Sequence, residues 1–139
     1  MRDLTGNPPK NIKDLIYKGL RSFNQKHFPD ADIASFACFA ESEMREIVGG
    51  LTGDVLFDKT FFIEFFWIEE NSRDIGVGTM LMDKLEHQAK SMEISGIYLD
   101  TYSFQALPFY LKLGFEEVGR YREFPVDDVD KILLKKRLK

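Results

Sequence analysis

The sequence contains very little cysteine and histidine, with one cysteine, Cys38, and two histidines, His27 and His87, among 139 residues. A lone cysteine excludes an internal disulfide, and no second cysteine is present to build a structural zinc site. Neither histidine belongs to a motif, so we expect both at the surface and Cys38 as a small, buried apolar residue. The sequence therefore predicts no bound metal.

Long hydrophobic runs are also missing. No apolar run reaches the roughly 18 residues that a membrane-spanning helix needs, and the first residues lack the basic-then-apolar layout of a signal peptide. We therefore expect a cytoplasmic protein without a membrane partner. The 19 basic and 23 acidic side chains give a net charge of −4, which provides no general attraction to nucleic acid.

Linkers, repeats and low-complexity segments are absent as well. The 44% hydrophobic content suffices for an ordinary core, and the length is typical of one domain. We expect residues 1–139 to form a single domain.

The hydrophobic pattern predicts alternating strands and helices. Apolar spacings of three and four indicate a helix over residues 10–25, and strand formers indicate a hairpin over 33–40 and 46–53. The aromatic segment 60–68 is typical of a central strand covered on both faces. The remaining expected elements are a helix over 76–92, a strand over 97–102, a short helix over 106–113, and strands over 115–121 and 130–138. This order predicts an α/β fold, a mixed sheet with helices packed over it.

A glycine-containing loop separates the aromatic strand from the next helix, with the sequence Arg73-Asp74-Ile75-Gly76-Val77-Gly78-Thr79. Glycines allow a tight turn, so amides at the helix start can converge on a phosphate, and an arginine can add charge-assisted hydrogen bonds. The loop lacks the third glycine of a dinucleotide fingerprint and the Gly-Lys-Ser/Thr of a P-loop. By itself it fits either a phosphate site or an ordinary structural turn.

A second motif follows about 30 residues later, with the sequence Ala106-Leu107-Pro108-Phe109-Tyr110-Leu111-Lys112-Leu113-Gly114-Phe115. In this order, Arg-x-x-Gly-x-Gly and Tyr-x-Lys-x-Gly-Phe resemble the two signatures of the GNAT superfamily of N-acetyltransferases. The resemblance covers residues 48–115 and is strongest to a subgroup of small bacterial proteins. It implies the acyl-CoA N-acyltransferase fold, a mostly antiparallel twisted sheet splayed between its two central parallel strands, and acetyl-CoA as the donor.

The same resemblance implies the binding residues. The loop residues Arg73, Asp74, Ile75, Gly76, Val77, Gly78 and Thr79 would surround the CoA pyrophosphate. The backbone of Phe66, Trp67 and Ile68 would pair with the pantetheine arm, and the amide of Trp67 or Ile68 would donate to the oxyanion. Ser103 stands where the subgroup has a small polar residue that contacts CoA. Tyr110 matches the usual general acid.

A general base is harder to assign. Glu64 alternates with Phe62, Phe66 and Ile68 on one strand face, and many members of the superfamily use a glutamate on this strand to activate the amine. Burial would raise the pKa of such a carboxyl group towards neutrality. A buried glutamate can also form a structural ion pair, so both interpretations remain open.

Three functions are compatible with these motifs. The first is acetyl transfer from acetyl-CoA to a primary amine of a small molecule or peptide, by direct attack in a ternary complex. The second is a non-catalytic CoA-binding module, and the third is a protein that binds another nucleotide. Tyr110 and Glu64 favour the enzyme, and the missing P-loop lysine weakens the third. Cys38 lies outside both signatures, so we expect no covalent intermediate. A homodimer is implied by the resemblance alone.

Residues 124–131 depart from the subgroup, which often has Pro-Pro-Gly-His followed by basic residues here. Three acidic residues, Asp127, Asp128 and Asp130, stand in this segment. It is either a solvated turn or an element that attracts a cationic amine.

Overall fold

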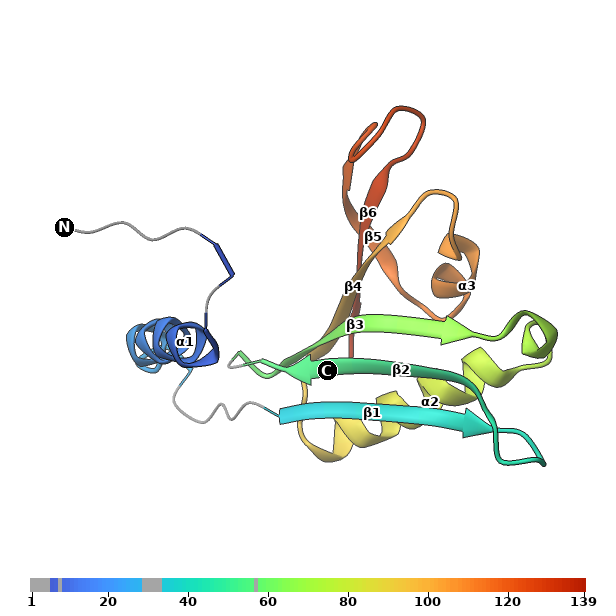
Figure 1. The fold of residues 1–139 in the computed structure, drawn as a ribbon, viewed down its shortest axis with the longest axis horizontal. Coiled ribbons are helices and arrows are strands. Elements are labelled where there is room, and N and C mark those ends of the chain that lie inside the picture. Colours follow the sequence, from blue (N-terminus) through green and yellow to red (C-terminus); the bar gives the residue numbers. More distant parts are fainter. Residues whose placement is uncertain (1–5, 8, 29–33, 57) are drawn as a thin grey trace.

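The computed structural model describes residues 6–7, 9–28, 34–56 and 58–139. They form a mixed six-stranded sheet in the order β1-β2-β3-β4-β6-β5 (Figure 1). The elements in chain order are α1 (Lys10–Asn24), β1 (Ala34–Glu41), β2 (Ile47–Val55), β3 (Thr60–Ile68), the 3₁₀ helix η1 (Glu70–Ser72), α2 (Val77–Ser91), β4 (Gly96–Tyr102), α3 (Leu107–Lys112), β5 (Glu116–Tyr121) and β6 (Lys131–Arg137). The predicted order of elements is confirmed.

The sheet divides into two wings at its centre. β3 and β4 run parallel and pair only at Thr60–Gly96, Phe61–Ile97 and Phe62–Tyr98. The other neighbouring strands are antiparallel. β4 stays paired with β6 as far as Tyr102, so β3 and β4 separate beyond Phe62. This is the expected splay between two central parallel strands.

A β-bulge in β3 lies just beyond the last of these pairs. Thr52 of β2 pairs with Phe65, whereas its neighbour Gly53 pairs with Ile63. Glu64 is therefore the extra residue, and a bulge of this kind bends a strand and increases its twist. The bend coincides with the point where β3 leaves β4.

The bulge reverses the alternation of side chains along β3. Ile63 is buried on the face covered by α2, Glu64 and Phe65 are both exposed, and Phe66 packs against the core again. The expectation that Glu64 shares a face with Phe66 and Ile68 is therefore wrong, as is the expectation of a buried Glu64. The strand is also not covered on both faces, since Phe65 is 67% exposed.

Helix α2 covers one face of the sheet (Figure 1). Its buried residues are Leu81, Met82, Leu85 and Ala89, and they meet the strand side chains Leu51, Phe61, Ile63, Ile97, Leu99, Ile132 and Leu134. The predicted apolar side of this helix is confirmed at three positions. Met92 is exposed because it lies at the C-cap, where the helix has ended.

Helix α1 stands apart from the sheet, beyond the end of the sheet where β1 and β3 begin (Figure 1). Its predicted extent is confirmed, but none of its residues is buried. Among the described residues, no helix has the length and apolar character to cross a membrane.

Candidate active site

The start of α2 presents free backbone amides. Asp74 and Gly76 have positive φ angles of 62° and 88°, and this tight turn leads directly into Val77. The helix has no side-chain cap and no acidic residue in its first turn. The amides of Val77, Gly78 and Thr79 thus lack the partners that a cap supplies. Together with the helix dipole, they form a site suited to an anion such as phosphate.

Arg73 connects this loop to the end of β3. Its Nε donates a hydrogen bond to the backbone oxygen of Ile68, at 2.8 Å. The side chain is exposed, and this bond leaves the two Nη groups of the guanidinium for another acceptor. Arg73 therefore lies between the strand end and the amides that open α2.

The hydrogen bonds between β2 and the end of β3 identify which backbone groups of β3 face the gap between β3 and β4. The amide of Glu69 donates to the oxygen of Val48 at 2.7 Å. Hydrogen-bonded and non-hydrogen-bonded pairs alternate in an antiparallel ladder, so Trp67 directs its backbone groups to Gly50. Ile68 then points away from β2, as its bond to Arg73 also indicates, and so does Phe66. These groups face the edge that β4 has left.

An aromatic cluster brings α3 to the same place. The ring of Phe66 lies 5.8 Å from that of Phe109 and 6.3 Å from that of Tyr110, both edge to face. Gly78 lies so close that a Cβ there would be 3.0 Å from Cζ of Phe109. The start of α2, the end of β3 and α3 therefore converge, and Phe109 is a positioning residue that the sequence analysis did not single out.

Tyr110 is the titratable residue of this cluster. It is 7% exposed, and burial raises the pKa of its phenol to about 12. Desolvation disfavours the charged phenolate, so the hydroxyl keeps its proton throughout the neutral range. This side chain can donate a proton but cannot act as a resting base.

Glu64 lies on the opposite face of the sheet. Its exposed side chain and that of Phe66, which contacts Tyr110, point in opposite directions from the same strand. Among the described residues Glu64 forms no salt bridge, so the structural ion pair is not observed. The proton donor Tyr110 and the carboxylate of Glu64 therefore lie on opposite faces of the sheet. They can act on two different reactants bound in the gap between β3 and β4.

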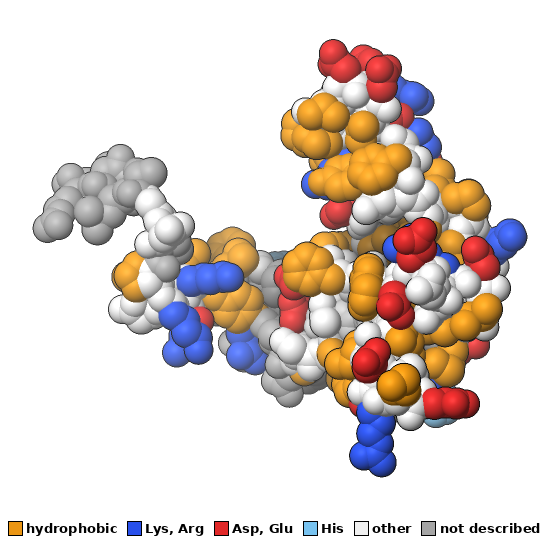
Figure 2. Space-filling view, turned by 45° about the vertical axis from the view of Figure 1, so that its right-hand side comes forward, with side chains coloured by type: hydrophobic (Ala, Val, Ile, Leu, Met, Phe, Trp, Pro, Cys, Tyr) orange, Lys and Arg blue, Asp and Glu red, His pale blue; other side chains and the backbone are white. Residues whose placement is uncertain are grey.

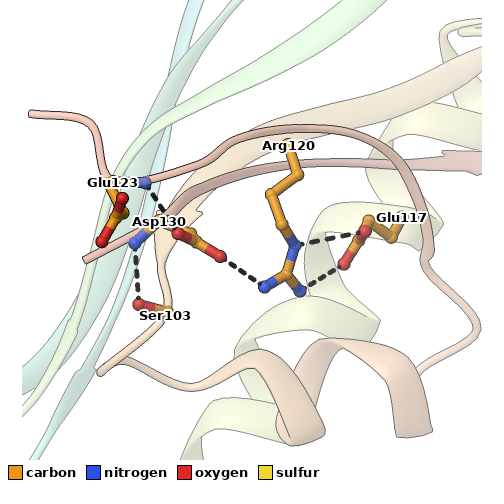
Figure 3. Close-up of polar contacts among 5 residues, drawn as sticks. All are labelled: Ser103, Glu117, Arg120, Glu123 and Asp130. Atoms are coloured by element: carbon orange, nitrogen blue, oxygen red, sulfur yellow. Dashed lines mark hydrogen bonds and ion pairs between the residues drawn. The ribbon is translucent and has the colours of Figure 1, made fainter. Parts of the chain in front are cut away.

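Ser103 is already engaged by the protein. The Ser103 hydroxyl accepts a hydrogen bond from the backbone amide of Asp130 at 3.0 Å, and the Ser103 amide donates to the backbone oxygen of Asp130 at 2.9 Å. The Asp130 carboxylate accepts from the Glu123 amide and from Arg120, both at 2.9 Å (Figure 3). Arg120 also pairs with Glu117 at 2.7 Å. This network ties the turn before β6 to the end of β4.

The charges within this network stabilise one another. The pKa of Asp130 is lowered by the hydrogen bond from the Glu123 amide and by Arg120, and Arg120 also lowers the pKa of Glu117. Sequence analysis missed Arg120, because a single arginine in a strand gives no local signal of its partners.

The remaining candidate residues lie outside this convergence. Cys38 is half-buried on β1, where its thiol lies 3.6 Å from the oxygen of Leu81, and burial raises its pKa. His27 and His87 are exposed, as expected. In the part of the chain that the structure describes, no three histidine, cysteine or acidic side chains form a metal site.

Comparison with known proteins gives the family. The model of the acetyltransferase (GNAT) family matches residues 9–115, a span that contains the α2 loop and the Tyr110 motif. The chain belongs to this family. It is thus an acetyl-transferring enzyme, and its sheet and helices have the GNAT arrangement.

Individual relatives agree with this membership. The GNAT chain is 26% identical over 128 residues to the blasticidin-S acetyltransferase of Streptomyces morookaense, covering 91% of this chain and 93% of the relative. A crystal structure of an acetyltransferase from Bacillus cereus ATCC 14579 is 28% identical, with a TM-score of 0.82 and 97% of each chain covered.

A third protein shares the fold and was solved with its donor. It is a putative streptothricin acetyltransferase from Bacillus anthracis str. Ames, in complex with acetyl coenzyme A. Its TM-score is 0.67 at 21% identity, covering 81% of this chain and 66% of that one.

Proposed function

We propose that the protein transfers the acetyl group of acetyl-CoA to a primary amine of a small molecule or peptide. The observation that carries this proposal is the convergence of three features: free amides at the start of α2, an unpaired edge of β3, and the protonated phenol of Tyr110. Each feature meets one requirement of acyl transfer from a thioester.

The amides of Val77, Gly78 and Thr79, with Arg73, would hold the CoA pyrophosphate. The residues fit this group, because the first turn carries no acidic side chain to repel it, and a Cβ at Gly76 would meet nothing within 4 Å. Asp74 and Ile75 shape the turn through their backbone. Ser103 would contact the cofactor through its hydroxyl proton, since its oxygen already accepts from Asp130.

The backbone of β3 would align the pantetheine arm along its free edge. Phe66 and Ile68 face this edge, and Trp67 supports it through its pairing with β2. We assign the oxyanion contact to the amide of Ile68 rather than that of Trp67, because the Ile68 amide points into the splay. A preorganised donor of this kind contributes roughly 3–4 kcal/mol to transition-state stability.

Acetyl-CoA would supply the acetyl group as a reactive thioester. The acceptor amine would enter from the face that carries Glu64 and attack the carbonyl carbon, forming the amide C–N bond as the C–S bond breaks. Glu64 would accept the proton of the amine, directly or through water. Tyr110 would give its proton to the departing sulfur from the other side of the sheet. The transfer is direct, and Cys38 takes no part in it.

The acceptor we propose is a cationic small molecule with a primary amine. The chain outside α1 is acidic, and acidic side chains gather at the tip of the β5–β6 wing (Figure 2). One relative is named for its action on blasticidin S, which makes an amine-bearing antibiotic the first compound to test.

The direct experiment is a free-thiol release assay with acetyl-CoA. The acceptor panel should contain blasticidin S, streptothricin, aminoglycosides, polyamines, amino acids and peptides, with product masses 42 Da above the acceptor as the readout for acetylation. We expect acceptor-dependent thiol release that Tyr110→Phe suppresses. Tight CoA binding without release for any acceptor would contradict the proposal and favour a non-catalytic CoA-binding module.

A further inference from the structure

Helix α1 carries an apolar stripe that its own chain leaves uncovered. The stripe consists of Ile12, Leu15, Ile16, Leu20 and Phe23, all of them exposed, with Phe23 78% exposed. A helix of 15 residues is marginal in water unless its apolar side is packed. In Figure 2 the part of the molecule formed by α1, next to the grey residues, carries hydrophobic side chains together with lysines and arginines. The helix therefore needs a partner surface.

The face of the sheet opposite α2 offers such a surface, which we call the open face. Phe39, Phe65 and Trp67 lie on it at the β1–β3 wing, with Phe65 67% and Trp67 53% exposed. Towards β4 the open face continues into a groove of about 540 Å³. Phe62 and Tyr98 line this groove, with their rings 5.1 Å apart. No described helix covers the open face (Figure 1).

Helix α1 and the rest of the chain have opposite net charge. Lys10, Lys13, Lys18 and Arg21 outnumber Asp14 and give α1 a net charge of +3. The chain as a whole has a net charge of −4, so the other 124 residues carry −7. On the open face, Glu41 and Glu64 are exposed at the β1–β3 wing, whereas the groove is lined by residues of both signs, Asp58, Asp100, Lys135, Lys136 and Arg137. Electrostatics thus favours an acidic surface for α1, such as the body of this same protein, over a basic or neutral partner.

We propose that two copies of this chain exchange their α1 helices, each placing its apolar stripe on the open face of the other. Both surfaces belong to one chain, so a twofold axis satisfies both at once. Within a single chain α1 stands beyond the edge of the sheet, away from the open face (Figure 1). Because Glu64 lies on the open face, the exchanged helix would also line the side of the site from which the acceptor amine enters. This consequence rests on the proposed function.

Cross-linking between differently tagged chains tests the exchange. In a Cys38→Ala background, one chain carries Leu20→Cys and the other Phe65→Cys, and the two are co-expressed and treated with a short bismaleimide. We expect a mixed product of about 32 kDa, twice the mass of the 16.1 kDa chain. Asp14→Cys in place of Leu20→Cys is the matched control, since it lies on the side of the same helix away from the stripe and should give little product.

A second arm places both cysteines in one chain. A cross-link confined to single 16.1 kDa chains would mean that α1 folds over its own sheet and would overturn the proposal, as would the absence of any product. In light scattering we expect a dimer that Leu20→Glu converts to a monomer and Asp14→Lys, on the side of α1 away from the stripe, leaves intact. A monomeric parent that instead binds anionic phosphatidylserine vesicles would also overturn it. None of these readouts uses acetyl transfer, so they stand or fall separately from the proposed function.

Discussion

Phe66 and Tyr110 lie edge to face with their ring centroids 6.3 Å apart, although one is on β3 and the other on α3. The bulge at Glu64 turns the Phe66 side chain to this side of the sheet, while its backbone faces the splay. The contact therefore fixes the phenol relative to the free edge of the strand. In our account this edge aligns the thioester, and the phenol is the acid that serves it.

Replacing Arg73 with alanine should weaken CoA binding. The guanidinium would lose its contact with the pyrophosphate, and a hydrogen bond from a charged group is worth about 1.5–3 kcal/mol, roughly a ten- to hundredfold change in Kd. Isothermal calorimetry with CoA measures this change. Arg45→Ala, at an exposed arginine outside the loop, is the control, and an Arg73→Ala affinity equal to that of the parent would count against the pyrophosphate site.

Replacing Tyr110 with phenylalanine should slow turnover while leaving CoA affinity nearly unchanged. The substitution keeps the ring contacts with Phe66 and Phe109 but removes the proton donor, and general acid catalysis contributes roughly 10²–10⁴-fold. Steady-state kinetics with a saturating acceptor, together with calorimetry, separates the two effects. Equal kcat values would remove Tyr110 from the mechanism.

The same residue should make the fold sensitive to alkali. Burial raises the folded-state pKa of Tyr110 from 10.0 to about 12, so the unfolded chain ionises first as the pH rises. The contribution of the buried neutral phenol to the free energy of unfolding is complete below pH 10. Between about pH 10 and pH 12 the free energy of unfolding falls by roughly 2–3 kcal/mol. Urea denaturation from pH 8 to pH 12 should show this loss in the parent and a smaller loss in Tyr110→Phe. Parallel curves for the two proteins would contradict the buried phenol.

Glu64→Gln should change how the rate depends on pH. The amide cannot take the proton of the amine, so the acidic limb of the kcat/KM profile that reports the base should disappear and the rate should fall. Glu41→Gln, on the same open face, is the control. If the parent and Glu64→Gln give superimposable profiles, another group or bulk water accepts the proton.

The local elements of the fold could be predicted from the sequence, and the contacts between distant elements could not. The apolar spacing of Leu81, Leu85 and Ala89 fixed the buried side of α2, because helical periodicity is a local property. The glycine loop was recognisable for the same reason. The roles of Phe109 and Arg120 depend on partners far along the chain, and no spacing rule reports them.

Glu64 shows most clearly where pattern reasoning fails. Regular alternation placed it with Phe66 and Ile68, but one inserted residue reverses the faces of a strand. The bulge arises where β3 is released from β4, and this is a tertiary event that the aromatic run 60–68 does not encode locally. The same event turns the predicted buried glutamate into an exposed one.

Hydrogen exchange with and without saturating CoA tests the central claim most directly. If amides at the start of α2 hold the pyrophosphate and the free edge of β3 aligns the pantetheine arm, CoA should protect the amides of Phe66, Ile68 and residues 76–79. The amides of β1 and β5 should exchange as before. Tight CoA binding with unchanged exchange at Ile68 and residues 76–79 would contradict the account.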